Sequence, residues 1–354
     1  MLDLETLKMR LKELDAQSDG LSWPAEAVKL LGEAGCRRNV VAVEFGGAAA
    51  APQQQLETYQ AVAWGSLSLA LILTQNDAAC ELLGDCDNAE LAQQLLPRCA
   101  RGEFLFTVGI SQLTTSRRSV GPAMKAEIDG DLQAGSASGF RISGVMPWVT
   151  SAPHADHIVT GAVLPDGMQI LAAVPTDSDG LSVSEPMRLM ALGSSWTCEV
   201  RCQDVHVETG QLMRGPAERV LAIRAPVKPL SVSAVGLGAA ERLLHEVRAL
   251  ATTVDQVPAL LDEKIVPRFE SIRRRLYDAA DMLSDPSNEI PAMDIRVAVN
   301  DLVVRLAGTL MTLSKGSGYL LSHQTQRLTR EAMFFLVWSA PPHVQAGTLE
   351  HLWA

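Results

Sequence analysis

The hydrophobic periodicity of this chain changes twice, and these changes restrict the possible folds more than any other feature of the sequence. In residues 1–101 apolar side chains recur every three or four positions, as Leu7 and Leu11 do, which is the spacing of an amphipathic helix. In residues 104–215 the period shortens to two, and short apolar segments alternate with turn sequences. Helical spacing returns in residues 216–354. The pattern predicts an α+β protein in which a β-domain lies between two helical parts.

The two helical parts can be divided further. Ser22, followed by Pro24 and Glu26, predicts a helix start that is capped by the serine. Segment 56–74 predicts one long buried helix because it is apolar almost throughout, and segment 89–100 predicts another. The C-terminal part predicts four antiparallel helices, with apolar faces in Val235–Leu250, Phe269–Leu283, Ile295–Leu313 and Arg330–Trp338. The expected domains are 1–102 (N-terminal helical), 103–215 (β-barrel or sandwich) and 216–354 (C-terminal four-helix bundle).

Composition excludes several classes of protein. With 47% hydrophobic and 20% charged residues the chain is in the range of globular proteins. A net charge of -11 argues against nucleic acid or an anionic membrane as a partner. The charged N-terminus does not resemble a signal peptide, and no uninterrupted apolar run is long enough for a membrane span, so we expect a cytoplasmic protein. The six cysteines contain no C-x-x-C pair, so we expect no metal site and no disulfide.

A candidate ligand-binding stretch lies in the middle of the β-domain, between residues 139 and 160. A strand with Phe140 and Ile142 on its buried face is expected to end at Pro147. Trp148-Val149-Thr150 then places an aromatic ring beside a hydroxyl group, and His154 and His157 follow as candidate proton donors. This combination suits a flat heteroaromatic ligand. The alternative is a tryptophan that fills a corner of the barrel core.

Several segments, in order, resemble the acyl-CoA dehydrogenase superfamily over nearly the whole chain. They are Trp23–Gly35, Glu44–Gly47, a buried helix, Leu95–Glu103 and the Trp148-Val149-Thr150 triplet. The resemblance implies an acyl-CoA dehydrogenase-like fold that forms homodimers or homotetramers. It also implies a flavin, normally FAD, between the β-domain and the C-terminal bundle.

The resemblance also implies positions for the cofactor. Residues 106–116 are similar to the family's strand and loop at the pyrimidine edge of the flavin, although Gly109 and Ile110 replace the usual Thr-Glu pair. Residues 315–319 are similar to the family's glycine-rich turn at the adenosine half. The cofactor-binding residues that follow are Val108, Thr114, Thr115, Trp148, Thr150, Gly316 and Gly318.

Departures from the family concern the base and the phosphate contact. Counting from Arg330 places Ser339 where the family has its catalytic glutamate, and counting back from Gly347 places Ala346 there. The second candidate position for the base falls on about Lys228, which is a base only if burial lowers its pKa strongly. The arginine that reaches the pyrophosphate of FAD is replaced within residues 252–256, where Asp255 would repel phosphate. Arg117 and Arg118 could replace that arginine; otherwise the chain binds FMN or binds no flavin.

Three functions remain open from the sequence. The first is a flavin-dependent oxidoreductase that acts on an acyl thioester or another small molecule without the usual base. The second is a flavin monooxygenase or oxidase, since superfamily relatives with that activity also lack the glutamate. The third is a non-catalytic descendant that serves as a binding or scaffold protein. We expect little dehydrogenase activity on saturated acyl-CoAs, because neither Ser339 nor Ala346 is a carboxylate.

Overall fold

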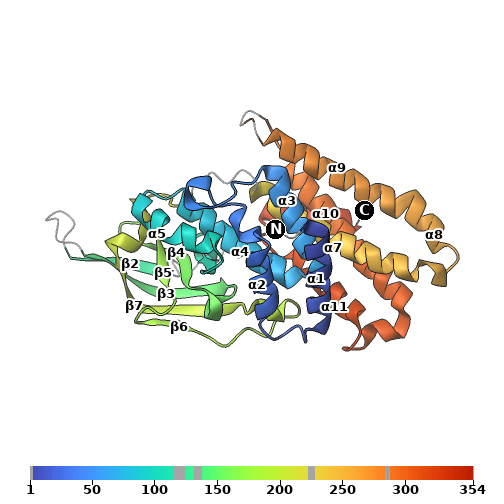
Figure 1. The fold of residues 1–354 in the computed structure, drawn as a ribbon, viewed down its shortest axis with the longest axis horizontal. Helices are drawn as coiled ribbons and strands as arrows, with labels where there is room; N and C mark the ends of the chain where they lie inside the picture. Colours follow the sequence, from blue (N-terminus) through green and yellow to red (C-terminus); the bar gives the residue numbers. More distant parts are fainter. Residues whose placement is uncertain are drawn as a thin grey trace.

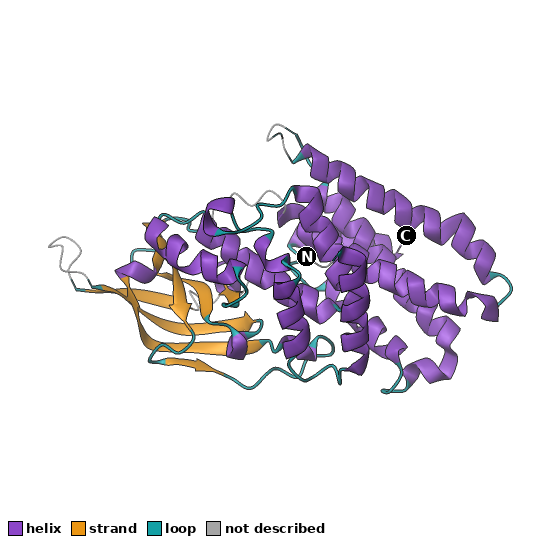
Figure 2. Cartoon of the chain, viewed as in Figure 1, coloured by secondary structure: helices purple, strands orange, loops and turns teal. Residues whose placement is uncertain are grey.

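The structure, a computed structural model, describes residues 3–114, 124–130, 138–221, 228–283, 285 and 288–353. A β-sheet lies at one end of the molecule, the C-terminal helices lie at the other, and the N-terminal helices lie between them (Figures 1 and 2). The predicted α+β class, with helical, β and helical parts in that order, is confirmed.

The N-terminal helices follow the predicted periodicity with two corrections. The predicted single helix over 56–74 is two helices that meet at Ser66, which is extended with φ -155°. Gly65 marks this break because a Cβ there would lie 2.6 Å from the Cβ of Leu11, so α1 packs directly on it. Pro24, and not Ser22, is the N-cap of the second helix. The helices are α1 (Leu4–Gln17), α2 (Ala25–Glu33), α3 (Pro52–Gly65), α4 (Leu67–Gly84) and α5 (Ala89–Ala100).

The sheet has the strand order β6-β7-β3-β2-β4-β5-β8, with β1 paired in parallel to β4. The strands are β1 (Phe106–Gly109), β2 (Met124–Asp129), β3 (Gly139–Val149), β4 (His157–Val163), β5 (Gln169–Pro175), β6 (Leu181–Val183), β7 (Cys198–Glu208) and β8 (Leu212–Ala217). Pro147 does not end β3 as predicted. The ladder between β3 and β7 is interrupted after Met146 and resumes at Val149, which faces Cys198. β8 was not predicted, because Gly215 and Pro216 within it are typical of a turn.

The C-terminal helices form the other end of the molecule. They are α7 (Lys228–Leu250), α8 (Val257–Leu260), a π-helical turn (Leu261–Ile265), α9 (Val266–Met282), α10 (Ala292–Ser314), α11 (Gln324–Ala332) and α12 (Pro342–Trp353). The predicted helix over Arg330–Trp338 is wrong. α11 begins earlier, at Gln324, and after Ala332 the chain continues as a 3-10 turn, Met333–Leu336.

The two helical parts share one hydrophobic core, to which α1, α3, α4, α7, α9 and α10 all contribute. Gly238 allows a close approach between them, because a Cβ there would lie 2.2 Å from the carbonyl oxygen of Gln60 in α3. Because this core includes residues from both sides of the predicted limits at 102 and 215, it does not define domain boundaries, and these limits stay predictions.

One segment, Ala292–Tyr319, is long and apolar enough by length and composition to cross a membrane, contrary to the expectation from the sequence. Its most apolar window is 67% buried inside the protein, which is how the central helix of a globular bundle behaves.

A buried polar network connects α4 with the first strand of the sheet. The side-chain oxygen of Asn76 accepts a hydrogen bond from the Phe106 amide (3.1 Å), and its nitrogen donates to Asp77 (3.2 Å). The Tyr59 hydroxyl donates to the other oxygen of Asp77 (2.8 Å). Asp77 is 2% exposed, and burial raises its pKa to about 7. A titratable carboxyl group thus lies at the junction of helix and sheet.

Candidate functional site

The Trp148 triplet lies at the C-terminal end of β3, an interior strand between β7 and β2. Trp148 is 53% exposed, whereas Thr150 is buried. The Thr150 hydroxyl lies 3.2 Å from that of Thr197, which in turn lies 3.0 Å from the hydroxyl of Ser195. The Thr107 hydroxyl donates to the Thr150 carbonyl at 2.6 Å. The triplet therefore combines an exposed indole with a buried threonine whose hydroxyl is held by a chain of hydroxyl groups.

In the loops around Thr150, several residues other than glycine have a left-handed backbone conformation. Ser151 and Leu192 both have φ 61°, and Trp196 has φ 46°. The Ser151 amide donates to the Ser195 carbonyl at 2.9 Å, which joins the two loops. Such conformations each cost about 1–3 kcal/mol and are concentrated at functional sites. The strain, together with the exposure of Trp148, favours a functional assignment for the end of β3 over a core tryptophan.

His154 and His157 do not share a site. His154 is stacked on Trp23 (ring centroids 4.1 Å apart) and lies 4.7 Å from Trp196. His157 packs against Phe106 instead, at 5.7 Å. Burial lowers the pKa of both histidines, so both favour the neutral form. The structure therefore does not support a joint role for them as proton donors.

The segment after β1 supplies a site residue that the sequence did not single out. Val108 is buried in β1, and its neighbour Gly109 uses its carbonyl to accept a hydrogen bond from the Gln112 amide nitrogen at 2.7 Å. The Gln112 amide nitrogen also lies 3.1 Å from the Thr160 hydroxyl. Its amide oxygen is buried and has no hydrogen-bond partner among the described residues. An orphaned acceptor at this position suits a ligand with an N–H group.

The remaining residues predicted in this loop are placed only in part. Thr114 is the last residue of the short helix α6 (Ser111–Thr114). Thr115, Arg117 and Arg118 lie outside the described residues.

The two predicted glycines of the 315–319 turn differ in their surroundings. Gly316 is exposed, and a Cβ there would meet nothing within 4 Å. Gly318 is buried, and a Cβ there would lie 2.8 Å from the Ser314 Cβ. Helix packing therefore accounts for Gly318 without a ligand.

The candidate base positions differ from expectation in their environment. Ser339 follows Phe334, Phe335, Val337 and Trp338 in the sequence, which predicts an apolar, poorly hydrated environment, but it is exposed and has φ 43° in the turn after α11. Ala346 is exposed on α12. Lys228 is the first residue of α7, and its side chain lies outside the described part. Asp255 is exposed as well, in the segment that replaces the family's phosphate-binding arginine.

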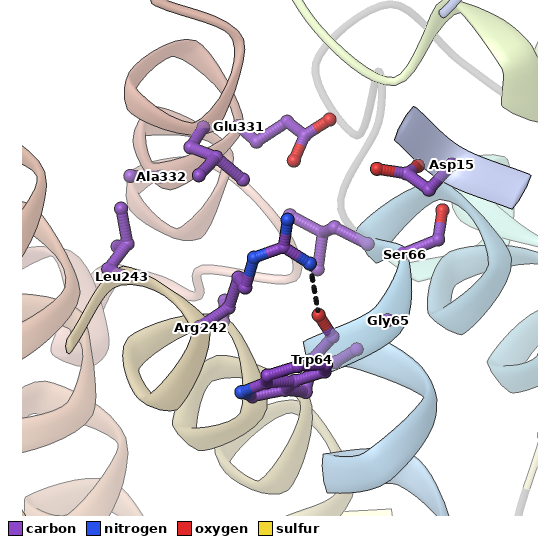
Figure 3. Close-up of a pocket in the computed structure, with 12 residues that line it drawn as sticks. Asp15, Trp64, Gly65, Ser66, Arg242, Leu243, Glu331 and Ala332 are labelled. Atoms are coloured by element: carbon purple, nitrogen blue, oxygen red, sulfur yellow. Dashed lines mark hydrogen bonds between the residues drawn. The ribbon is translucent and has the colours of Figure 1, made fainter. Parts of the chain in front are cut away.

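A small cavity lies away from these residues, between α1, the α3–α4 junction, α7 and α11 (Figure 3). Arg242 is buried there and donates to the Trp64 carbonyl (3.2 Å) and to Glu246 (2.9 Å). Its second terminal nitrogen has no partner among the described residues. Burial raises the pKa of Glu331, which Figure 3 shows on the opposite wall. The volume of about 20 Å³ has room for about one water molecule, far too little for a flavin.

Comparison with known protein sequences finds similarity to acyl-CoA dehydrogenases. Residues 5–103 match the family model described as "Acyl-CoA dehydrogenase, N-terminal domain". The chain is 22% identical over 342 residues to the probable acyl-CoA dehydrogenase YngJ of Bacillus subtilis (strain 168), covering 91% of this chain and 88% of the relative.

Two solved structures show the same fold. Glutaryl-coenzyme A dehydrogenase in its glutaryl-CoA complex has a TM-score of 0.84 at 18% identity, covering 100% of this chain and 96% of that one. KijD3, in a complex with FMN and a dTDP-linked amino-keto sugar, has a TM-score of 0.76 at 22% identity, covering 99% and 91%. At these identities the likeness establishes the fold.

Proposed function

Because the chain is a divergent relative of the acyl-CoA dehydrogenase superfamily and has its fold, we propose that it is a flavin-dependent oxidoreductase that does not carry out standard acyl-CoA dehydrogenation. The observation that argues against standard acyl-CoA dehydrogenation concerns the two positions at which the catalytic glutamate is expected. Ser339 and Ala346 are both exposed and neither is a carboxylate. A general base needs a proton-accepting group of suitable pKa within reach of the substrate, and neither a serine hydroxyl without an activating partner nor an alanine provides one.

Side chains at the C-terminal end of β3 and in α6 have the chemistry that suits a flavin. Trp148 offers an exposed aromatic face, and the buried Gln112 oxygen lacks a donor among the described residues, which the N–H of a flavin pyrimidine ring would supply. The Thr150 hydroxyl, which lies 3.2 Å from that of Thr197, would add a polar contact. A bound flavin would supply the two-electron acceptor, and these side chains would bind and orient it.

FAD is the cofactor we propose, with FMN as the alternative. Thr252 stands where the resemblance places the family's phosphate-binding arginine, and the nearby exposed Asp255 would repel phosphate, so this segment offers no cation to the pyrophosphate of FAD. KijD3 is an FMN complex with this fold, which keeps FMN open.

Oxidase or monooxygenase chemistry on a small molecule is the second candidate function. The same missing base favours it, because these reactions need no carboxylate in the dehydrogenase position. The amino sugar in the KijD3 complex indicates that the fold accommodates ligands other than acyl thioesters. A non-catalytic binding protein is the third candidate, and flavin uptake distinguishes it from the other two.

We predict that the purified protein binds FAD or FMN and gains the absorbance of an oxidised flavin. Trp148→Ala should weaken flavin binding, because the flavin loses its stacking contact with the indole. Trp148→Phe keeps an aromatic ring and should retain most of the affinity. Thr150→Val should cost about 1 kcal/mol of flavin affinity, roughly a fivefold rise in Kd, because it removes one polar partner. Flavin fluorescence quenching measures each Kd.

Thr197→Val is the matched control, because it breaks the same hydroxyl chain without changing residue 150. An equal loss in Thr150→Val and Thr197→Val would assign the effect to the loop and not to a contact with flavin. A protein that takes up neither flavin would favour a non-catalytic binding protein. Wild-type affinity in Trp148→Ala would place the flavin elsewhere.

We also propose that the chain is a homodimer or homotetramer. Large apolar side chains are exposed in the turn after α10 and on the C-terminal segment, including Tyr319, Leu321, Val337 and Trp353. Exposed apolar groups of this size favour burial against another protein surface. Light scattering at micromolar concentration should therefore give two or four times the chain mass of 38.0 kDa. A mass of one chain would contradict the proposal.

A further inference from the structure

Two cysteine side chains from neighbouring helices are in direct contact. The sulfur of Cys80 on α4 lies 3.2 Å from the sulfur of Cys99 on α5. The residues are 1% and 0% exposed, respectively, and both belong to the core cluster beneath the sheet. Because a disulfide has an S–S distance of about 2.0 Å, the sulfurs need to approach by only about 1 Å to bond.

The two thiols are also held in place. The Cys99 thiol donates to the side-chain oxygen of Asn76 at 3.5 Å, and the Asn76 amide nitrogen lies 3.9 Å from the Cys80 sulfur. Since Asn76 also accepts from the amide of Phe106, the pair is adjacent to the start of β1. This arrangement restrains both side chains toward each other.

The other cysteines lack such a neighbour within the described part of the chain. Cys198 and Cys202 lie four residues apart in β7, so their Cα atoms are separated by about 13 Å, beyond the reach of a disulfide. Cys36 is buried, and Cys86 uses its thiol to donate to the Asn88 carbonyl at 3.2 Å.

We propose that Cys80 and Cys99 form a disulfide when the protein meets a hydroperoxide. One thiol is oxidised to a sulfenic acid, and the hydroperoxide is reduced to water or an alcohol. The sulfur of the other thiol then attacks the sulfenic sulfur; the S–S bond forms, the S–O bond breaks and water leaves with the second thiol's proton. The two thiols lose two electrons, and the hydroperoxide gains them. The bond would join α4 to α5.

The oxidant must reach a buried pair, so the reaction depends on local opening of α5. The hydrogen-bonded Cys99 thiol and burial raise the pKa of Cys80, which keeps it protonated. Disulfide formation should therefore be slower than for an exposed thiol and should speed up in mild denaturant.

The test treats the full-length chain with hydrogen peroxide, alkylates the remaining thiols in denaturant and maps the modified peptides by mass spectrometry. We expect four alkylated cysteines in place of six, with a cross-link between Cys80 and Cys99 that dithiothreitol removes. Oxidised protein should also show a Tm a few degrees higher than reduced protein, because the cross-link restricts the unfolded chain.

Cys86→Ser is the matched control and should retain the cross-link, because Cys86 lies in the loop between the two helices and contacts neither sulfur. Cys99→Ser should lose both the cross-link and the rise in Tm. If Cys99→Ser fails to fold, the peptide map of the wild type still shows whether Cys80 and Cys99 are cross-linked. Six free thiols after oxidation, or a cross-link through Cys86, would overturn the proposal.

Discussion

Flavin-loaded protein mixed with butyryl- to palmitoyl-CoA is expected to reduce its flavin about 100- to 10,000-fold more slowly than an acyl-CoA dehydrogenase with its glutamate base. Ser339 is exposed at the position expected from Arg330, and a serine hydroxyl needs an activating partner to act as a base. Among the described residues no side chain forms a hydrogen bond with it. Stopped-flow absorbance of the flavin band measures the rate.

Ser339→Glu and Ser339→Gln form a matched pair for this prediction, because they differ in charge and not in size. A faster reaction in Ser339→Glu alone would identify residue 339 as the base position. Because the site is exposed, we expect the glutamate to remain well hydrated and the gain to be small. Rapid flavin reduction by the wild type would contradict the prediction and would mean that another residue is the base.

The second large effect concerns stability and pH. Burial raises the pKa of Asp77 in the folded protein to about 7, above the ordinary value of 3.8. The folded protein therefore binds one more proton than the unfolded chain between these values, and stability falls as pH rises from about 4 to about 7. Above pH 7 the full cost of the buried charge, up to about 4 kcal/mol, is present.

Asp77→Asn cannot ionise, so its stability relative to the wild type should increase by about 3 kcal/mol between pH 4.5 and pH 8. Urea unfolding at both pH values measures the difference. Asp87→Asn is the control, because Asp87 is exposed and pairs with Arg214 at 3.7 Å, an ion pair worth at most about 1 kcal/mol. An equal difference between Asp77→Asn and wild type at both pH values would show that Asp77 is already ionised in the folded state at pH 4.5.

The sequence predicts those parts of the fold that depend on local signals. α5 has the predicted limits, because Asn88 caps it and its apolar residues keep a helical period. The break at Ser66 was missed because the sequence on both sides of it is equally apolar, and the contact with α1 decides where the chain turns. The end of α11 at Ala332 was missed for a similar reason, since Phe334 and Phe335 continue the apolar pattern beyond it.

The candidate site was predictable where the resemblance names residues. Trp148 is exposed and the Thr150 hydroxyl is held by Thr197, but the contact of either residue with a flavin stays a prediction. Gln112 gave no signal, because an orphaned acceptor becomes visible only when its three-dimensional neighbours are known. The burial of Asp77 and Arg242 was missed for the same reason, since each occurs within a helix whose sequence does not specify which tertiary partners cover it.

The links between α4, α5 and the sheet have a consequence for the cooperativity of unfolding. Asn76 fixes the start of β1, and the Asn88 amide at the cap of α5 donates to the Leu212 carbonyl at the start of β8. β1 itself pairs with β4, so the strand that directly follows the N-terminal helices is part of the sheet. The N-terminal helices and the sheet are therefore expected to unfold together and not one after the other. Cutting the chain at residue 102 would leave both fragments without surfaces on which each depends.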